Sequence, residues 1–304
     1  MYMDCLSWNI GDIKITRLVE SAGTGPMGGP DSFLAEAYPD VLKQIDWLIP
    51  DFVTEVGHAR FSLHALLVQT PNYRLIVDTC VGNDKDRVMP YFNRLSTSFL
   101  QDLEAFGWSR DSVDGVLCTH LHVDHVGWNT MLVDGQWVPT FPKAQYFMAR
   151  SEYVYWEREV AGMAPDEVGV RAIMDTRATF TDSVQPVIDA GLEVLVDCDA
   201  QIVPGIRLIP TPGHSPGHVS VVVESLGERA IITGDMMHHP CQVARPEWAA
   251  AFDSDSQEST ATRRAFFREY ADTPTLVIGT HFGGPTAGYL KQVGGEYQFR
   301  APAP

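Results

Sequence analysis

Three histidines and one aspartate lie within six consecutive positions of this 304-residue chain, at His120, His122, Asp124 and His125. Packing gives no reason for so many imidazoles on one short segment, whereas imidazole nitrogens and carboxylate oxygens are what Zn²⁺ and Fe²⁺ bind. In an extended segment, residues two apart point the same way, so His120 and His122 can converge on one ion. In an extended segment Asp124 would point the same way as His120 and His122, whereas His125 would point the opposite way. A turn at Asp124 would therefore turn this second pair toward a second ion.

Further candidate ligands follow short apolar segments downstream. They are His214 after the run 206–209, Asp235 after the run 229–234, and His281 after the run 275–280. Prolines and glycines around the first of them indicate a tight loop. Each of the three comes at the end of a predicted buried strand, as His120 does after the run 115–118. We therefore expect these three residues and His120 to lie together at one edge of a sheet.

This set of motifs resembles the metallo-β-lactamase superfamily. The motifs arrive in the family's order, within roughly Ile13 to Tyr289: His120-x-His122-x-Asp124-His125, Thr211-Pro212-Gly213-His214, Gly234-Asp235 and His281. The resemblance implies an α/β fold, an αββα sandwich of two mixed β-sheets flanked by helices, with a dinuclear metal site at the sheet edges. It also implies that the first metal is held by His120, His122 and His214, the second by Asp124, His125 and His281, and that Asp235 bridges them.

The chemistry that this resemblance implies is hydrolysis. Two divalent ions, most simply Zn²⁺ with Fe, Co or Mn as alternatives, would share a hydroxide at about 3.5–4 Å separation and lower its pKa to near neutrality. One ion would polarise the carbonyl or phosphoryl oxygen and the other would stabilise the leaving alkoxide. Asp124 would hydrogen-bond the hydroxide and help to deliver a proton to the leaving group, which makes it a candidate catalytic residue.

Departures from particular branches of the family narrow the substrate class. The redox diiron branch has a carboxylate where this chain has His122, and true β-lactamases lack the bridging aspartate that Asp235 supplies. The basic glutathione-binding tail of glyoxalase II-type thioesterases is not recognisable. Well-known acyl-homoserine lactonases have a substrate-contacting tyrosine three residues after the bridging aspartate. Here that position is His238, a candidate catalytic residue that either donates the same hydrogen bond or marks a different substrate, as on the methyl parathion hydrolase side of the family.

The sequence thus predicts a dinuclear metal-dependent hydrolase that opens a lactone, an acyl-homoserine lactone among the candidates, or cleaves a carboxylic ester. The enzymatic alternative is a phosphotriester hydrolase of the methyl parathion type. A non-catalytic metal-binding protein is the alternative from a different class, and the complete ligand set argues against it. A redox protein is a third class, disfavoured because no flavin-binding domain is recognisable.

The composition limits the classes of partner that the protein can bind and the compartment that suits it. The net charge is −17 and no cluster of Lys and Arg is longer than a pair, which opposes binding to nucleic acid or anionic membranes and suggests a neutral or apolar small-molecule substrate. The five cysteines are scattered without a C-x-x-C pair, which indicates a reducing compartment with free thiols. The start of the chain does not resemble a secretory signal and no apolar run approaches transmembrane length, so we expect a cytoplasmic protein.

One metallo-β-lactamase-fold domain over 1–304 is the simplest organisation for a chain that is 45% hydrophobic. Two segments lie outside the ligand pattern: 21–56, expected to be a capping or homodimerisation extension, and 128–190, expected to be a helical insertion. Our hypothesis is that both help to form an apolar pocket, and core or dimer-interface packing is the alternative. The candidate lining residues are Phe33, Trp47, Trp128 and Tyr153.

Local patterns predict the elements that position these residues. Strands are expected at 13–19 and 61–69, and helices at 96–106, 151–160, twice within 165–190, and at 257–270. Asp78 follows the apolar run 75–77 and is a candidate to orient a ligand histidine. His218 opens a predicted strand and His64 sits in an apolar run, so structural roles are expected for both.

Overall fold

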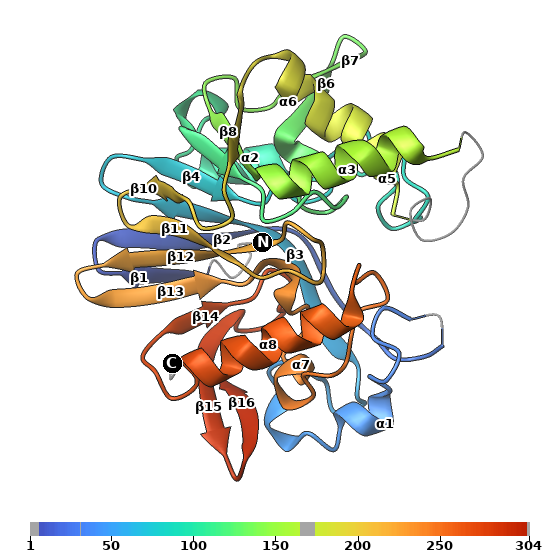
Figure 1. The fold of residues 1–304 in the computed structure, drawn as a ribbon, viewed down its shortest axis with the longest axis vertical. Coiled ribbons are helices and arrows are strands. Elements are labelled where there is room, and N and C mark those ends of the chain that lie inside the picture. The colour runs from blue at the N-terminus through green and yellow to red at the C-terminus, as the bar shows by residue number, and fades with distance from the viewer. Residues whose placement is uncertain (1–5, 31, 165–173, 303–304) are drawn as a thin grey trace. The chain divides into compact units, whose positions relative to one another are not determined.

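The computed structural model describes residues 6–30, 32–164 and 174–302. The chain forms two compact units, and each contains a mixed seven-stranded sheet with helices beside it (Figure 1). The first unit comprises Met1–Glu20 and His64–Cys198, and the second comprises Ser21–Leu63 and Asp199–Pro304. The prediction of an α/β fold with two mixed sheets flanked by helices is confirmed.

The sheet of the first unit has the strand order β1-β2-β3-β4-β5-β8-β9. Its strands are β1 (Ser7–Ile10), β2 (Ile13–Gly25), β3 (Ala59–Gln69), β4 (Arg74–Val77), β5 (Gly115–Leu117), β8 (Gln145–Ala149) and β9 (Glu193–Val196). Strands β4, β5, β8 and β9 pair in parallel. Because the carboxyl ends of parallel strands meet at one edge, the residues after β4, β5 and β8 gather there. These include Asp78, the segment starting at Thr119, and Glu152.

The sheet of the second unit has the strand order β10-β11-β12-β13-β14-β15-β16. Its strands are β10 (Gln201–Val203), β11 (Ile206–Pro210), β12 (Val219–Ser225), β13 (Glu228–Ile232), β14 (Leu276–Ile278), β15 (Ala287–Val293) and β16 (Glu296–Arg300). Strand β12 is antiparallel to both β11 and β13, and β14 is parallel to β13. Strands β11, β13 and β14 therefore end at the same edge, and His214, Asp235 and His281 follow those three ends.

Helices and turns connect the strands of each unit. In the first unit they are α2 (Phe99–Ala105), η2 (Arg110–Ser112), η3 (Gly127–Asn129), α3 (Arg150–Gly162), α5 (Thr176–Thr179), the π-helical turn η4 (Phe180–Val184) and α6 (Gln185–Asp189), with a hairpin of β6 (Thr130–Val133) and β7 (Gln136–Pro139). In the second they are α1 (Pro39–Leu42), η1 (Asp46–Leu48), η5 (Gly234–Met236), α7 (Cys241–Ala244) and α8 (Ser256–Tyr270). Among the helices of the described ranges, none is both long and apolar enough to cross a lipid bilayer.

Local chemistry explains where the main helices begin and end. The Asp255 side chain accepts hydrogen bonds from the backbone N–H groups of Gln257 and Glu258, which caps the start of α8. Helix α2 is followed by Gly107 at φ +80°, a conformation that glycine adopts without steric cost and that stops the helix. The expected helices at 96–106, 151–160 and 257–270 are confirmed to within a few residues.

The predicted helices within 165–190 are found in part. Residues 176–189 form one helical stretch that includes the π-helical turn, while 165–173 lie outside the described residues. Within the wider segment 128–190, α3 begins at Arg150 and the other helices follow it. The residues before Arg150 form the end of η3 and the strands β6, β7 and β8, and β8 lies between β5 and β9 in the sheet.

The segment 21–56 contributes to the apolar core of the second unit. It supplies seven buried side chains: Leu34, Ala37, Leu42, Ile45, Leu48, Phe52 and Val53. Trp47 packs against the same core and is partly buried. Apolar packing therefore accounts for most of the aromatic and aliphatic residues that make this segment conspicuous in the sequence.

Candidate metal centre

Hydrogen bonds to the Asp78 carboxylate and between backbone groups fix the segment after β5 to the first sheet. Thr119 donates its backbone N–H to Oδ1 of Asp78 at 2.8 Å and its hydroxyl to Oδ2 at 2.9 Å. The carbonyl of His125 accepts the N–H of Thr79 at 2.7 Å, and the N–H of His125 donates to the carbonyl of His122 at 3.1 Å. The last contact closes a turn through Asp124.

That turn gathers three imidazoles. The ring centroid of His120 lies 4.5 Å from that of His122 and 4.0 Å from that of His125, and all three rings are buried. Nδ1 of His125 lies 2.9 Å from Oδ2 of Asp78, while its Nε2 lies 3.7 Å from Oδ1 of Asp124. The side chain of Asp124 is 15% exposed, so this carboxylate is the member of the group with most access to solvent.

In the second unit, Asp235 lies between two histidines. Its Oδ2 is 3.5 Å from Nε2 of His214, and its Oδ1 is 3.1 Å from Nε2 of His281. The backbone N–H of Asp235 donates to Nε2 of His218 at 2.9 Å, and Nδ1 of His218 lies 2.8 Å from the hydroxyl of Thr211. Both nitrogens of His218 are therefore used to hold neighbouring groups, and the structural role expected for this residue is confirmed.

His238 belongs to the same cluster. Its Nε2 lies 3.1 Å from Oδ2 of Asp235, and its ring centroid lies 4.8 Å from that of His214 and 6.0 Å from that of His281. The ring of Phe33 meets it edge to face at 4.5 Å. Burial lowers the pKa of His238, against the opposing effect of the Asp235 carboxylate. One ligand atom each from His214, Asp235 and His238 lie within 4.8 Å of one another.

Asp253 holds His214 in place and was not predicted from the sequence. Its Oδ1 lies 2.8 Å from Nδ1 of His214, and its Oδ2 accepts the hydroxyl of Ser259 at 2.6 Å. The buried guanidinium of Arg263 lies 3.7 Å from the same oxygen. Burial alone would raise the pKa of Asp253, but the hydrogen bond and charge of His214 bring it below its usual range. The carboxylate lies in an irregular segment, where no motif or periodicity distinguishes it.

The arrangement agrees with a known family. The sequence matches the profile of the Metallo-beta-lactamase superfamily over residues 60–281. The chain belongs to the metallo-beta-lactamase superfamily.

Named members of this superfamily and related solved structures are distant in sequence. An N-acyl homoserine lactonase of Bacillus thuringiensis is 25% identical over 40% of this chain and 38% of its own length. A probable metallo-hydrolase of Mycobacterium bovis is 25% identical over 58% of this chain and 57% of its own. The chain thus spans well under two thirds of the curated relatives that it matches.

Solved structures are similar over nearly the whole chain. The hydrolase AbOPH of the beta lactamase superfamily has a TM-score of 0.78 at 24% identity, over 98% of this chain and 97% of its own. The dizinc quorum-quenching lactonase AidC, solved with the product N-hexanoyl-L-homoserine, has a TM-score of 0.74 at 20% identity over the same shares. At these identities the similarity establishes the fold.

The donor set of this superfamily member suits divalent metal ions. Four of the proposed ligand histidines have Nδ1 within hydrogen-bond distance of a protein oxygen: His120 (Thr119 Oγ1), His125 (Asp78), His214 (Asp253) and His281 (the Ser62 carbonyl). Such partners orient a metal-binding histidine and select its tautomer. They turn Nε2 toward the carboxylates, as the 3.1 Å separation of His281 from Asp235 shows. Buried imidazoles and carboxylates arranged in this way are able to hold metals.

One ligand prediction needs a correction. The pattern of ligands after strands predicts His120 at the same sheet edge as His214, Asp235 and His281. The latter three do follow strands of one sheet, but His120 follows β5, which belongs to the sheet of the first unit. Similar strand-to-ligand patterns in the sequence do not distinguish one sheet from another, because they carry no information on which strands pair.

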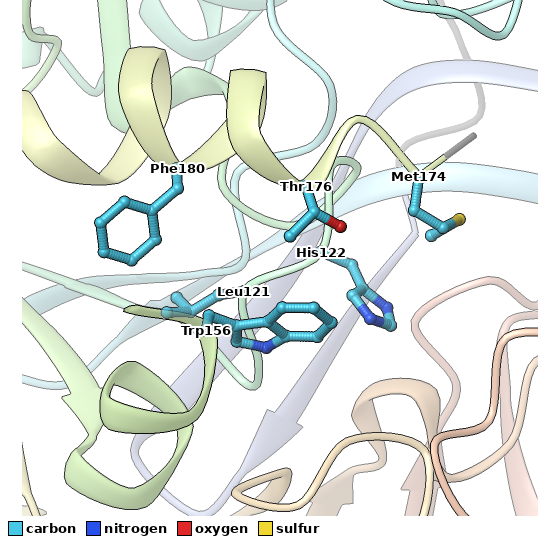
Figure 2. A pocket seen from close by; sticks show the side chains of 6 residues that line it. All are labelled: Leu121, His122, Trp156, Met174, Thr176 and Phe180. Atoms are coloured by element: carbon cyan, nitrogen blue, oxygen red, sulfur yellow. The ribbon is translucent and has the colours of Figure 1, made fainter. Parts of the chain in front are cut away.

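The superfamily scaffold carries an apolar pocket beside His122 (Figure 2). Its lining residues are Leu121, His122, Trp156, Met174, Thr176 and Phe180. The indole of Trp156 meets the imidazole of His122 with ring centroids 5.1 Å apart. Apolar side chains thus surround one of the histidines of the first unit.

The four aromatic residues proposed to line a pocket have different roles. Phe33 contacts His238, and Tyr153 packs against the pocket residue Phe180 at 5.8 Å between ring centroids. Trp128 instead stacks on Phe99 and donates its indole N–H to Glu20 at 2.7 Å. Trp128 and Trp47 are accounted for by packing, which was the alternative considered for them. Trp156 was missed because its alignment with His122 depends on how helix α3 packs.

Proposed function

We propose that this protein is a dinuclear metal-dependent hydrolase that opens a lactone or cleaves a carboxylic ester. The observation that carries the proposal is the pair of buried histidine and aspartate clusters, each with its imidazoles oriented by protein oxygens. Membership of the superfamily and the lactonases among its relatives support the same reaction class. Acyl-homoserine lactones are the first lactones to examine because relatives carry that name.

The proposed ligands are seven. His120, His122 and His214 would hold one ion, Asp124, His125 and His281 would hold the other, and Asp235 would bridge them. The order of these residues along the chain supports this assignment. Zn²⁺ fits nitrogen and carboxylate ligands, as do Fe, Co and Mn, so the metal is part of what the experiment must identify.

When bound, such ions make water a nucleophile near neutral pH and polarise the carbonyl of the substrate. The chain's own residues would do the rest. Asp124, whose carboxylate has most access to solvent, would move a proton from the attacking water to the leaving oxygen. His238 would donate a hydrogen bond to the substrate from its buried place between Asp235 and Phe33.

The substrate that we propose is neutral, with an apolar group. The pocket beside His122 is lined by Trp156, Phe180, Leu121 and Met174, which favour contact with an apolar group over contact with a charged group. A chain of net charge −17 opposes an approach by anions except where a metal compensates. Both observations favour an uncharged ester or lactone.

The first experiment measures metal content and hydrolysis together. Protein stripped with chelator and protein reloaded with Zn²⁺ would be assayed on an acyl-homoserine lactone, a γ-lactone, an aryl ester, an aryl phosphotriester and a β-lactam. We expect two ions per chain and metal-dependent turnover of a lactone or the aryl ester. His122→Ala should reduce turnover by at least about 100-fold, while His58→Ala, a histidine outside both clusters, should leave it unchanged.

The remaining outcomes separate the alternatives. Metal-dependent hydrolysis of the phosphotriester without any lactone or carboxylic ester would overturn our proposal in favour of a phosphotriesterase. Two bound ions with no hydrolysis of any member of the panel would favour a metal-binding protein without hydrolase activity. Turnover that survives complete removal of metal would contradict the mechanism.

A further inference from the structure

Glu152 is a buried carboxylate that takes no direct part in the proposed reaction. It lies in the first turn of α3, directly after β8, and is 1% exposed. Burying a carboxylate is costly unless hydrogen bonds replace its hydration. Its Oε1 accepts two of them, from the backbone N–H of Leu121 at 3.1 Å and from the indole Nε1–H of Trp156 at 2.6 Å.

The two donors belong to different parts of the proposed site. Leu121 separates His120 from His122, so a hydrogen bond to its N–H fixes the peptide between two proposed metal ligands. Trp156 forms a wall of the pocket and meets the ring of His122 (Figure 2). A single oxygen atom of Glu152 therefore fixes the position of the His120–His122 segment relative to Trp156 in the pocket wall.

Several features make a carboxylate suited to this position. An ionised acceptor makes shorter and stronger hydrogen bonds than a neutral one. The first turn of a helix favours negative charge, because the helix dipole is positive there. Trp156 lies four residues after Glu152 on the same face of α3, so the helix itself supplies the spacing for the second bond.

We propose that Glu152 is a positioning residue that couples metal binding by the His120–His122 segment to recognition of the apolar group of the substrate. The inference rests on the hydrolase function proposed above. According to this proposal, one buried side chain affects two properties. They are the affinity for metal and the preference for esters with a large apolar group over small esters.

Two substitutions distinguish positioning from charge. Glu152→Gln keeps an oxygen at the position of Oε1, which can still accept both N–H groups. Glu152→Met has a similar length and no oxygen, so both donors lose their acceptor. Glu157→Met is the matched control, because Glu157 is exposed on the same helix. Trp156→Phe removes the indole donor and leaves the hydrogen bond between Glu152 and Leu121 in place.

Two readouts are needed. The first is Zn²⁺ affinity of the metal-free protein, measured against a chromophoric chelator. The second is the ratio of kcat/KM for phenyl acetate to that for methyl acetate. We expect Glu152→Met to weaken Zn²⁺ binding by about 10- to 100-fold and to lower the ester ratio by about tenfold. Glu152→Gln should retain both within about threefold, and Trp156→Phe should lower only the ratio.

A structural role alone would lower the melting temperature of Glu152→Met without changing either readout in protein that is still folded, and that result would overturn the proposal. Equal losses in Glu152→Gln and Glu152→Met would overturn it as well, because they would show that charge rather than the acceptor oxygen matters. If Glu152→Met does not fold, Glu152→Gln and Trp156→Phe test the proposal. Glu152→Gln must then retain both Zn²⁺ affinity and the ester ratio, and Trp156→Phe must lower only the ester ratio. The Zn²⁺ titration needs no turnover, so failure of the hydrolase proposal is distinguishable from failure of this one.

Discussion

Nδ1 of His125 lies 2.9 Å from Oδ2 of Asp78, and neither side chain is more than 1% exposed. The same carboxylate accepts the backbone N–H and the hydroxyl of Thr119. Asp78 follows β4 and Thr119 follows β5, so parallel pairing of these strands is what brings the groups together. One buried carboxylate thereby orients a proposed metal ligand and fixes the start of the segment that carries three others.

Replacing Asp78 with Asn should weaken metal binding. The amide has one acceptor oxygen, so its NH₂ group must face either the N–H of Thr119 or the hydroxyl of Thr119 together with Nδ1 of His125. We expect Zn²⁺ affinity to fall by about 10- to 100-fold and the free energy of unfolding of the metal-free protein to fall by about 1–3 kcal/mol. Chelator competition and urea denaturation measure the two effects.

Asp86→Asn is the control for that experiment. Asp86 pairs with Arg94 on the surface, where the two side chains are 75% and 70% exposed. Exposed pairs contribute little, so its substitution should leave the free energy of unfolding nearly unchanged. Wild-type Zn²⁺ affinity in Asp78→Asn would show that His125 does not need this partner.

Asp253→Asn should destabilise the metal-free second unit. The substitution removes the charge opposite the buried Arg263 guanidinium and disturbs the hydrogen bond to His214. Breaking a buried ion pair from one side costs about 3–5 kcal/mol, because the remaining charge stays buried. Urea denaturation without metal measures this loss.

The neighbouring variant Asp255→Asn tests whether that loss is specific. Asp255 caps α8, and asparagine caps helices as well as aspartate does. Its free energy of unfolding should stay within about 0.5 kcal/mol of the wild type. A similar small change in Asp253→Asn would mean that Arg263 is adequately held by the backbone carbonyls it also contacts.

The contrast between Asp78 and Asp253 shows which supporting residues can be predicted from the sequence and which cannot. Asp78 ends an apolar run, so its place at a sheet edge and its role beside a histidine could be predicted. Asp253 and Glu152 lie 39 and 31 positions from the residues that they hold, and no local pattern connects them. The proposed ligands could be picked out from the sequence because they form short motifs that come after predicted strands. Which strands share a sheet could not be predicted, and His120 was therefore assigned to the wrong edge.

A buried lysine predicts an unusual pH dependence of stability. Burial lowers the pKa of Lys85 to about 8, although the carboxylate of Asp182 opposes the shift. Nζ of Lys85 contacts Thr130 Oγ1 and Asp182, and lies 3.8 Å from the ring centroid of Trp137. Arg87, which also binds Asp182, lowers the pKa further.

Between pH 8 and the usual lysine range, the unfolded chain binds a proton at Lys85 that the folded chain has released. The contribution of Lys85 to the free energy of unfolding therefore rises with pH across that window, by an amount on the order of 3 kcal/mol. Denaturation of wild type and Lys85→Met at pH 7.5 and pH 10 isolates it, because other titrations cancel in the difference. Lys43→Met, at a partly exposed lysine, should show no such trend. Parallel pH profiles for wild type and Lys85→Met would refute the shift.

The loop after the proposed ligands depends on a glycine. A Cβ on Gly127 would lie 1.8 Å from the carbonyl oxygen of Val81, which is backbone and cannot rotate away. The N–H of Gly127 also donates to the Cys80 carbonyl at 2.7 Å, so the loop is held against this segment. Gly127→Ala should cost at least about 3 kcal/mol in free energy of unfolding and displace His125, two residues earlier, with a loss of Zn²⁺ affinity.

Gly162→Ala, where a Cβ meets nothing within 4 Å at the end of α3, should be neutral or stabilising by up to about 1 kcal/mol. Thermal denaturation of both variants decides the matter: if they melt together, the close approach of Gly127 to Val81 does not constrain the loop.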